Sequence, residues 1–173
     1  MIVPGALWLA VKDGDERAAA IFKRHYSYHE YQDGRRRYGY RNRFLMLGPG
    51  EKMVLLSPGC DALFCWRKFI DKSGQVGVNC AIFRNESEVL SSTLILEAEQ
   101  LAWQRWPGER LYTYVNASAV ASSNPGYCYL KAGWRKCSTT KVKGLIVLEK
   151  LPALGRTHTP ACKPNAALEA ALI

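Results

Sequence analysis

The spacing of apolar and polar residues changes several times along this chain, which predicts short strands interrupted by helices. Seven apolar runs rich in β-branched and aromatic residues are bounded by Gly, Pro, Ser or Asp, as strands often are. These predicted strands are residues 6–11, 44–47, 53–56, 62–69, 78–83, 111–115 and 143–150. Helices that return between the later strands imply a mixed sheet, so we expect an α+β fold with a largely antiparallel sheet.

Three segments carry the signals of helices. The first begins at the acidic residues 13–16, has its apolar positions on one face, and ends near 26–29. The second, 91–106, starts with two serines in capping position, and the third, 124–133, is short, starts with Asn-Pro and ends at a glycine. On this pattern alone, the plainest interpretation is a generic α+β domain without a specific function.

The length of 173 residues is sufficient for one domain, which we place at 1–150, followed by an irregular proline-containing tail at 151–173. The composition, 48% hydrophobic and 23% charged, excludes intrinsic disorder, collagen and coiled coil. No apolar run approaches the roughly 18 residues of a membrane helix, and no basic signal-peptide start is visible. The six cysteines lack a C-x-x-C pair and favour reduced thiols over disulfides, so we expect a cytoplasmic protein.

The charge balance is the feature that suggests a partner. The chain has 24 Lys and Arg against 15 Asp and Glu, a net charge of +9, which is typical of a domain that binds a polyanion. Segment 30–43 lacks both the strand and the helix period, and we expect it to be a basic excursion that contacts double-stranded DNA through phosphates, guanine edges and stacked bases. The contact residues would be Arg35, Arg36, Arg37, Tyr38, Tyr40, Arg41 and Arg43. The alternative is a solvated charged segment without a ligand.

Two histidines four residues apart, His25 and His29, could lie on one helix face as metal ligands. Glu30 is a candidate third ligand, and such a His-carboxylate set with open positions would suit iron(II) better than structural zinc. The alternative is that His25 is a buried, hydrogen-bonded residue of an apolar helix face.

Residues 124–134 (NPGYCYLKAGW) are similar to the last helix of the GNAT N-acyltransferase fold, in which a tyrosine precedes a Gly-aromatic pair by four residues. Tyr129, Gly133 and Trp134 occupy these positions. The predicted order of strands and helices is also similar to that fold. The resemblance implies a sheet whose two central strands splay apart.

More narrowly, the chain resembles the Mom-type phage DNA-modification proteins, a divergent branch of that fold. The shared pieces are residues 25–27 (HYS), 83–86 (FRNE) and the Asn-Pro-Gly helix. This resemblance implies a phage-encoded enzyme that converts adenine in duplex DNA to a carbamoylmethyl adduct on the exocyclic amine, which protects the DNA from restriction. The target base would be flipped out of the duplex.

The donor molecule stays open. Relatives of the GNAT fold hold the pyrophosphate of acetyl-CoA in a glycine-rich loop after the central strand. Here residues 84–93 (RNESEVLSST) contain no glycine, and Glu86 and Glu88 would repel a pyrophosphate. The residues that could still hold an acetyl-CoA-like donor are Arg84, Ser91, Ser92 and Thr93.

The catalytic candidates are Tyr26, Arg84, Asn116 and Tyr129. Adenine's exocyclic amine is a poor nucleophile because its lone pair is delocalised, so an enzyme must align it, remove a proton and protonate the leaving group. The tyrosine in the position of Tyr129 lies beside the leaving thiolate in relatives. Asn116 could bind an adenine edge, and Arg84, at a strand end, could fix an anionic ligand. Alternatively, Tyr129 only packs, Asn116 closes a turn, and Arg84 pairs with Glu86 or Glu88.

Two other function classes compete with DNA modification. One is an ordinary acyl-CoA-dependent N-acyltransferase, which the glycine-free loop disfavours. The other is a non-catalytic DNA-binding accessory protein, which the retained Tyr26, Arg84 and Tyr129 disfavour. The sequence leaves the oligomeric state open, a homodimer included.

Overall fold

The structure is a computed structural model that describes residues 6–29, 43–70 and 72–153. This part of the chain forms seven strands and three helices. The strands are β1 (Leu9–Val11), β2 (Glu51–Leu56), β3 (Ala62–Lys68), β4 (Val78–Asn85), β5 (Leu111–Val115), β6 (Arg135–Thr139) and β7 (Ile146–Lys150). The helices are α1 (Glu16–Phe22), α2 (Ser91–Arg105) and α3 (Tyr127–Lys131).

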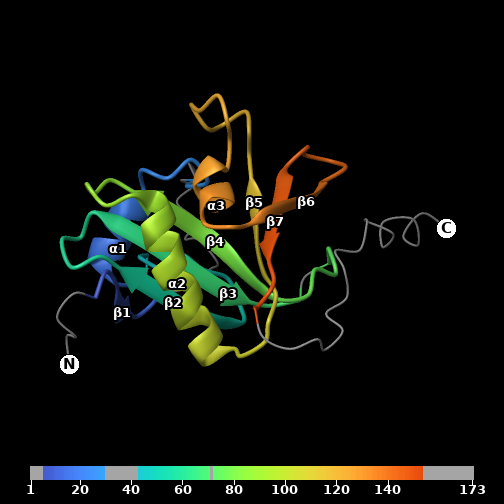
Figure 1. Cartoon of the computed structure of the whole chain (residues 1–173). Helices are drawn as coiled ribbons and strands as arrows, with labels where there is room; N and C mark the ends of the chain where they lie inside the picture. Colours follow the sequence, from blue (N-terminus) through green and yellow to red (C-terminus); the bar gives the residue numbers. More distant parts are fainter. Residues whose placement is uncertain (1–5, 30–42, 71, 154–173) are drawn as a thin grey trace.

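All seven strands belong to one sheet, in the order β1-β2-β3-β4-β5-β7-β6 (Figure 1). Neighbouring strands are antiparallel except for β4 and β5, which are parallel. The predicted α+β class with a mixed, largely antiparallel sheet is therefore confirmed.

The two faces of the sheet are covered by different helices (Figure 1). Alternate residues of a strand point to opposite faces, so a strand with apolar residues throughout contributes to two cores. Leu55 and Phe64 lie in the larger core, with the buried side of α2. Val54 and Leu63, their neighbours in sequence, lie in the second core, with the buried side of α1. The central strands are therefore buried on both faces.

Three tryptophan side chains attach α2 to the rest of the molecule. The indole N–H of Trp8 donates to the Leu94 carbonyl at 2.9 Å, and that of Trp66 donates to the Ala98 carbonyl at 3.0 Å. Trp134, just after α3, donates to the buried Glu99 carboxylate at 2.5 Å. Each ring therefore buries a large apolar surface while its polar atom keeps a partner.

The parallel strands β4 and β5 pair over only part of their length. Their register runs from Val78 opposite Leu111 to Cys80 opposite Thr113. Both strands continue beyond this point, to Asn85 and Val115, but they no longer pair with each other there. The space between the diverging ends is where the candidate site lies.

One predicted strand, 44–47, is wrong. The backbone N–H groups of Met46 and Leu47 donate to the Asp13 carboxylate at 2.8 and 3.3 Å. A side chain therefore satisfies buried amides that a neighbouring strand would otherwise have to satisfy. Conversely, β6 was not predicted, because this edge strand is mostly exposed and lacks an apolar alternation.

The helix boundaries differ from the predicted ones. Helix α1 ends at Phe22, before the predicted 26–29. Helix α2 is preceded by Leu90 without a side-chain cap bond, so the predicted serine cap is wrong. Helix α3 begins after Gly126, whose φ of +81° suits glycine, and not at the predicted Asn-Pro. Gly133, with φ of +87°, follows the end of α3 as predicted.

No disulfide joins the described cysteines, Cys60, Cys65, Cys80, Cys128 and Cys137. Cys162 and the predicted tail from residue 154 onward lie outside the described residues. None of the described helices combines the length and the apolar character that crossing a membrane requires.

Candidate functional site

A cavity of about 290 Å³ lies between the diverging ends of β4 and β5, beside α3 and the start of α2. This volume is close to the lower end, about 300 Å³, of ligand pockets in proteins. Its walls include residues from β4, β5, α3 and the turn after α1, among them Tyr26, Cys80, Arg84, Thr113, Cys128 and Tyr129. Three of the four predicted catalytic residues, Tyr26, Arg84 and Tyr129, are thus brought to one cavity.

Tyr129 is buried against the strand end that forms the cavity. Its hydroxyl lies 3.3 Å from the Cys80 Sγ, and its ring packs edge-on against Phe83 and Trp134 at centroid distances of 6.0 and 5.0 Å. Burial, together with Cys80, raises the pKa of Tyr129 well above its ordinary value. The hydroxyl therefore stays protonated at neutral pH, and it can donate a hydrogen bond.

The two cavity cysteines are not activated nucleophiles. Burial raises the pKa of Cys80 to about 12, although the Tyr129 hydroxyl and the Thr113 hydroxyl oppose this shift. Burial also raises the pKa of Cys128. Because the thiolate is the reactive form, both side chains act at neutral pH as small apolar walls of the cavity.

His25 and Tyr26 lie in the turn that follows α1. The His25 ring is buried, its Nδ1 lies 2.8 Å from the Ser27 hydroxyl, and it accepts from the Ser27 backbone N–H. Burial and then the nearby Arg84 guanidinium lower the pKa of His25 to about 4. The neutral imidazole lies 4.4 Å, centroid to centroid, from the ring of Tyr26, which is 46% exposed. Burial raises the pKa of the Tyr26 hydroxyl, because the ionised form of a phenol is the charged one.

The predicted metal site does not have the expected helical geometry. His25 and His29 both follow the end of α1 at Phe22, so they do not share a helix face. Among the residues that the structure describes, no group of three His, Cys, Asp or Glu side chains could hold a metal. The candidate third ligand, Glu30, lies outside the described residues. The alternative, a buried and hydrogen-bonded His25, matches the observed contacts.

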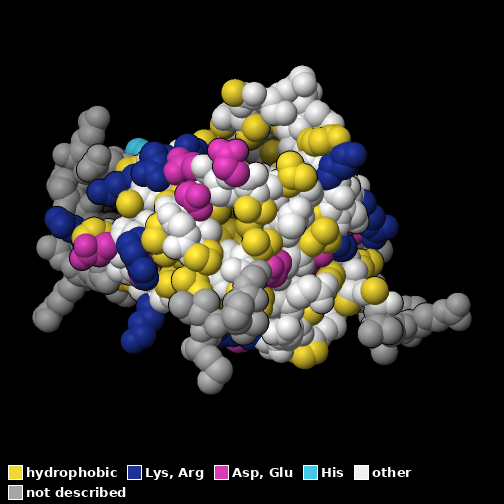
Figure 2. Space-filling model, turned by 60° about the vertical axis from the view of Figure 1, so that its left-hand side comes forward, with side chains coloured by type: hydrophobic (Ala, Val, Ile, Leu, Met, Phe, Trp, Pro, Cys, Tyr) yellow, Lys and Arg dark blue, Asp and Glu magenta, His cyan; other side chains and the backbone are white. Residues whose placement is uncertain are grey.

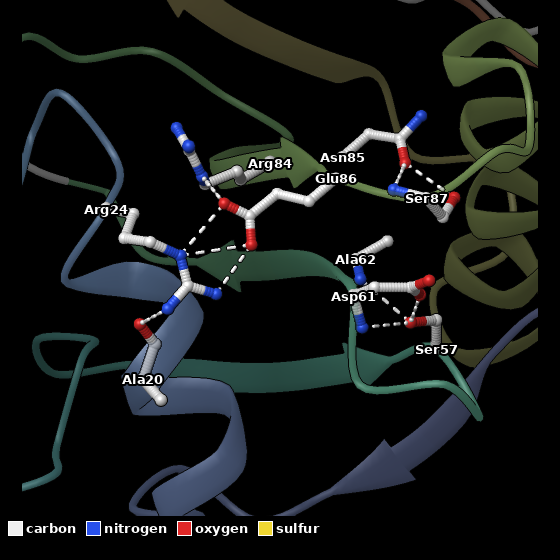
Figure 3. A network of polar contacts seen from close by, with 9 residues as sticks. All are labelled: Ala20, Arg24, Ser57, Asp61, Ala62, Arg84, Asn85, Glu86 and Ser87. Carbon is white, nitrogen blue, oxygen red and sulfur yellow. Dashed lines mark hydrogen bonds and ion pairs between the residues drawn. The ribbon is translucent and has the colours of Figure 1, made fainter.

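Arg84 lies within β4 and not after it, at the rim of the cavity. Its Nε donates to the Glu86 carboxylate at 2.8 Å, which is the ion pair considered as the alternative to a ligand contact. The same carboxylate accepts from Arg24, a residue that the sequence interpretation missed (Figure 3). Hydrogen bonds from Arg24 and then Arg84 lower the pKa of Glu86 to about 2. Glu86 therefore stays ionised, but two cations balance its negative charge, which weakens the expected repulsion of a pyrophosphate.

The other predicted residues have mainly structural contacts. The Asn116 side-chain oxygen accepts from the Ser118 N–H at 3.2 Å and from its hydroxyl at 2.7 Å, so Asn116 closes a turn. Ser91 lies at the cavity wall, where its hydroxyl accepts from the Asn85 amide at 3.0 Å. Ser92 and Thr93 belong to the first turn of α2 and are not part of the cavity lining.

Most of the predicted DNA-binding segment, 30–42, lies outside the described residues. Arg43 is described, and its guanidinium stacks over the Phe44 ring at 4.8 Å. On the face shown in Figure 2, Lys and Arg side chains lie next to Asp and Glu side chains, so basic charge is not continuous there.

A second basic segment was missed by the sequence interpretation. The chain has no acidic residue between Glu109 and Glu149. At the end of this stretch, β6 and β7 form an antiparallel hairpin whose connection, 140–145, carries exposed Lys141 and Lys143. The absence of Asp and Glu over this length could have revealed this segment from the sequence, because it can be seen without any secondary-structure pattern.

The chain matches no protein-family model, and searches of curated proteins and of solved structures give no match either.

Proposed function

We propose that this protein modifies adenine in double-stranded DNA, forming a carbamoylmethyl-type adduct on the exocyclic amine, and that its sheet is of the GNAT type. The observation that supports this most is the cavity between the diverging parallel strands, where Tyr26, Arg84 and Tyr129 meet. The Mom-type resemblance rests on two of these three positions and on the helix that carries the third. On this proposal the protein acts in the cytoplasm of the host cell.

A base must leave the duplex to reach such a cavity. Flipping costs a few kcal/mol and is favoured by aromatic side chains that stack on the extruded base. Tyr26, half-exposed beside the buried His25, offers an aromatic surface at the cavity wall. The base would therefore enter next to Tyr26. His25 is uncharged at neutral pH, so it adds no positive charge beside Arg84.

The buried Tyr129 hydroxyl would serve the reacting centre as a hydrogen-bond donor. Burial raises its pKa, so the phenol keeps its proton and would stabilise charge on the leaving atom by donating a hydrogen bond rather than by transferring the proton. Arg84 would hold the anionic part of the donor, since a guanidinium makes strong charge-assisted bonds to carboxylates and phosphates. The neutral thiols of Cys80 and Cys128 would shape the cavity without forming a covalent intermediate.

The surface charge is suited to a DNA substrate. Lys141 and Lys143, on the exposed connection between β6 and β7, would bind DNA phosphates, and so would the arginines expected to contact DNA in segment 35–43. Phosphate contacts position a protein on DNA and supply much of its affinity. These contacts could offset the cost of base flipping.

The test is nucleoside mass spectrometry of DNA from cells that express the chain. We expect a modified adenine, and unmodified DNA in the presence of folded protein would overturn the proposal. Tyr129→Phe should lower the adduct level about 100-fold, because it removes only the hydroxyl that donates to the leaving atom. The control is Tyr127→Phe, on the exposed side of the same helix. Arg84→Ala should abolish the adduct, and its persistence would remove the cavity from the mechanism.

A further inference from the structure

We infer that Arg24 and Arg84 form a binding site for a phosphate-class anion, and that the Glu86 carboxylate occupies this site in the absence of ligand. The inference extends the proposed function and rests on it for the source of the anion, which is either the DNA backbone or the pyrophosphate of a nucleotide-type donor. It adds Arg24, which no sequence pattern suggested, to the candidate site.

The geometry is that of a carboxylate held by a guanidinium fork and a second cation (Figure 3). The Nε and Nη2 of Arg24 donate to the two Glu86 oxygens at 2.9 and 2.5 Å, and the Arg84 Nε donates to Oε2 at 2.8 Å. A tetrahedral phosphate presents pairs of oxygens that suit the same fork, so it can replace the carboxylate without a new arrangement of donors.

The fold fixes the backbone position of each arginine. Arg24 follows α1, and its Nη1 donates to the Ala20 carbonyl at 2.9 Å. Arg84 belongs to β4, where its neighbour Leu63 fixes the backbone register. These two cations come from elements 60 residues apart in sequence, which only the packing of α1 against the sheet brings together. The packing of α1 therefore brings both guanidinium groups to the same carboxylate.

The Glu86 side chain can leave the two arginines without a change in the backbone. The Glu86 backbone N–H donates to the Asp61 carbonyl at 2.7 Å, which fixes the main chain, while the side chain stays 26% exposed. Ion pairs at such exposure contribute little to stability, so releasing the Glu86 side chain costs little. Two guanidinium groups against one carboxylate also leave an unbalanced positive charge at the cavity rim.

The position of the cluster fits the cavity beside it. Arg84 and Asn85 line the cavity, whereas Arg24 and Glu86 lie just outside it. An anion bound by both arginines would therefore sit at the cavity rim. A phosphate next to the extruded base, or the pyrophosphate of a donor whose reactive end enters the cavity, would occupy this position.

The experiment measures binding by the full chain of two probes, a short DNA duplex and coenzyme A, without any reaction. Glu86→Gln removes the competing charge and should tighten binding of at least one probe about tenfold relative to Glu88→Gln, an exposed neighbour with the same charge change. Arg24→Ala should weaken binding of that probe about tenfold relative to Arg17→Ala, an exposed arginine at the other end of α1.

The probe that responds identifies the source of the anion. A response of DNA alone assigns the site to a backbone phosphate, and a response of coenzyme A alone assigns it to the donor. If Glu86→Gln equals Glu88→Gln and Arg24→Ala equals Arg17→Ala for both probes, the anion site is refuted. Thermal melting of each variant checks that it is folded. Since no step requires catalysis, failure of the adenine proposal leaves this result readable.

Discussion

The buried carboxylate of Glu149 allows a sharp test of how the sheet beside the cavity is held together. Its oxygens accept from the Arg110 Nε at 2.5 Å and from the Arg135 Nη2 at 2.7 Å. The Arg110 side chain is 6% exposed and that of Arg135 is 62% exposed, so the same carboxylate has one buried and one solvated partner. Glu149→Gln keeps the size of the side chain and removes its charge.

The expected cost follows from the burial of Arg110. Removing one partner of a buried ion pair destabilises a protein by about 3–5 kcal/mol, because the other charge is left uncompensated. Arg110 keeps hydrogen bonds to the Gln75 side chain at 2.9 Å and the Val76 carbonyl at 3.0 Å, so we expect about 3 kcal/mol. Arg135→Ala, which removes only the solvated partner, should cost about 0–1 kcal/mol.

The assay is urea unfolding followed by circular dichroism. With a slope near 2 kcal/mol per molar urea, Glu149→Gln should lower the midpoint by about 1.5 M, and Arg135→Ala by less than about 0.5 M. The double variant Arg110→Met with Glu149→Met should recover much of the loss, because it leaves no buried charge unpaired. Equal midpoint shifts for Glu149→Gln and Arg135→Ala would refute the reasoning.

Two further predictions concern acid stability and DNA binding. Because the folded state lowers the pKa of His25 from 6.5 to about 4, the unfolded chain binds the extra proton in that window, and stability should fall by roughly 3 kcal/mol as pH drops from 6.5 to 4. His25→Gln should lose this component of the pH dependence, and an unchanged profile would contradict it. Replacing Lys141 and Lys143 with Ala should reduce the salt slope of DNA binding by about 2, whereas Lys12 and Lys72 serve as exposed controls without this effect.

The candidate site was only partly predictable. Tyr26, Arg84 and Tyr129 were selected from the sequence and line one cavity. The predicted contact of Asn116 with an adenine edge is not supported, because its side chain closes a local turn. Arg24 carries no distinguishing pattern in the sequence. Its role arises from an ion pair with a residue 62 positions away, and such pairs depend on packing and not on spacing.

Most of the strands, the body of the long helix and the basic character of the chain could be predicted from the sequence. Apolar periodicity located β2, β3, β4, β5, β7 and the body of α2, and the glycine at 133 marked the end of α3, because these signals act over a few residues. The excess of basic residues is likewise a property of composition.

Which strands are neighbours, and where they separate, depends on packing between segments that are far apart in the sequence. This packing placed β5 parallel to β4 and ended their pairing at Cys80 and Thr113, which opened the cavity. The Asp13 carboxylate accepts hydrogen bonds from the Met46 and Leu47 N–H groups, so no strand forms there. The exposed strand β6 pairs at the sheet edge. Hydrogen bonds between distant segments satisfy the backbone in ways that a single sequence does not reveal, because any strand offers the same donors and acceptors.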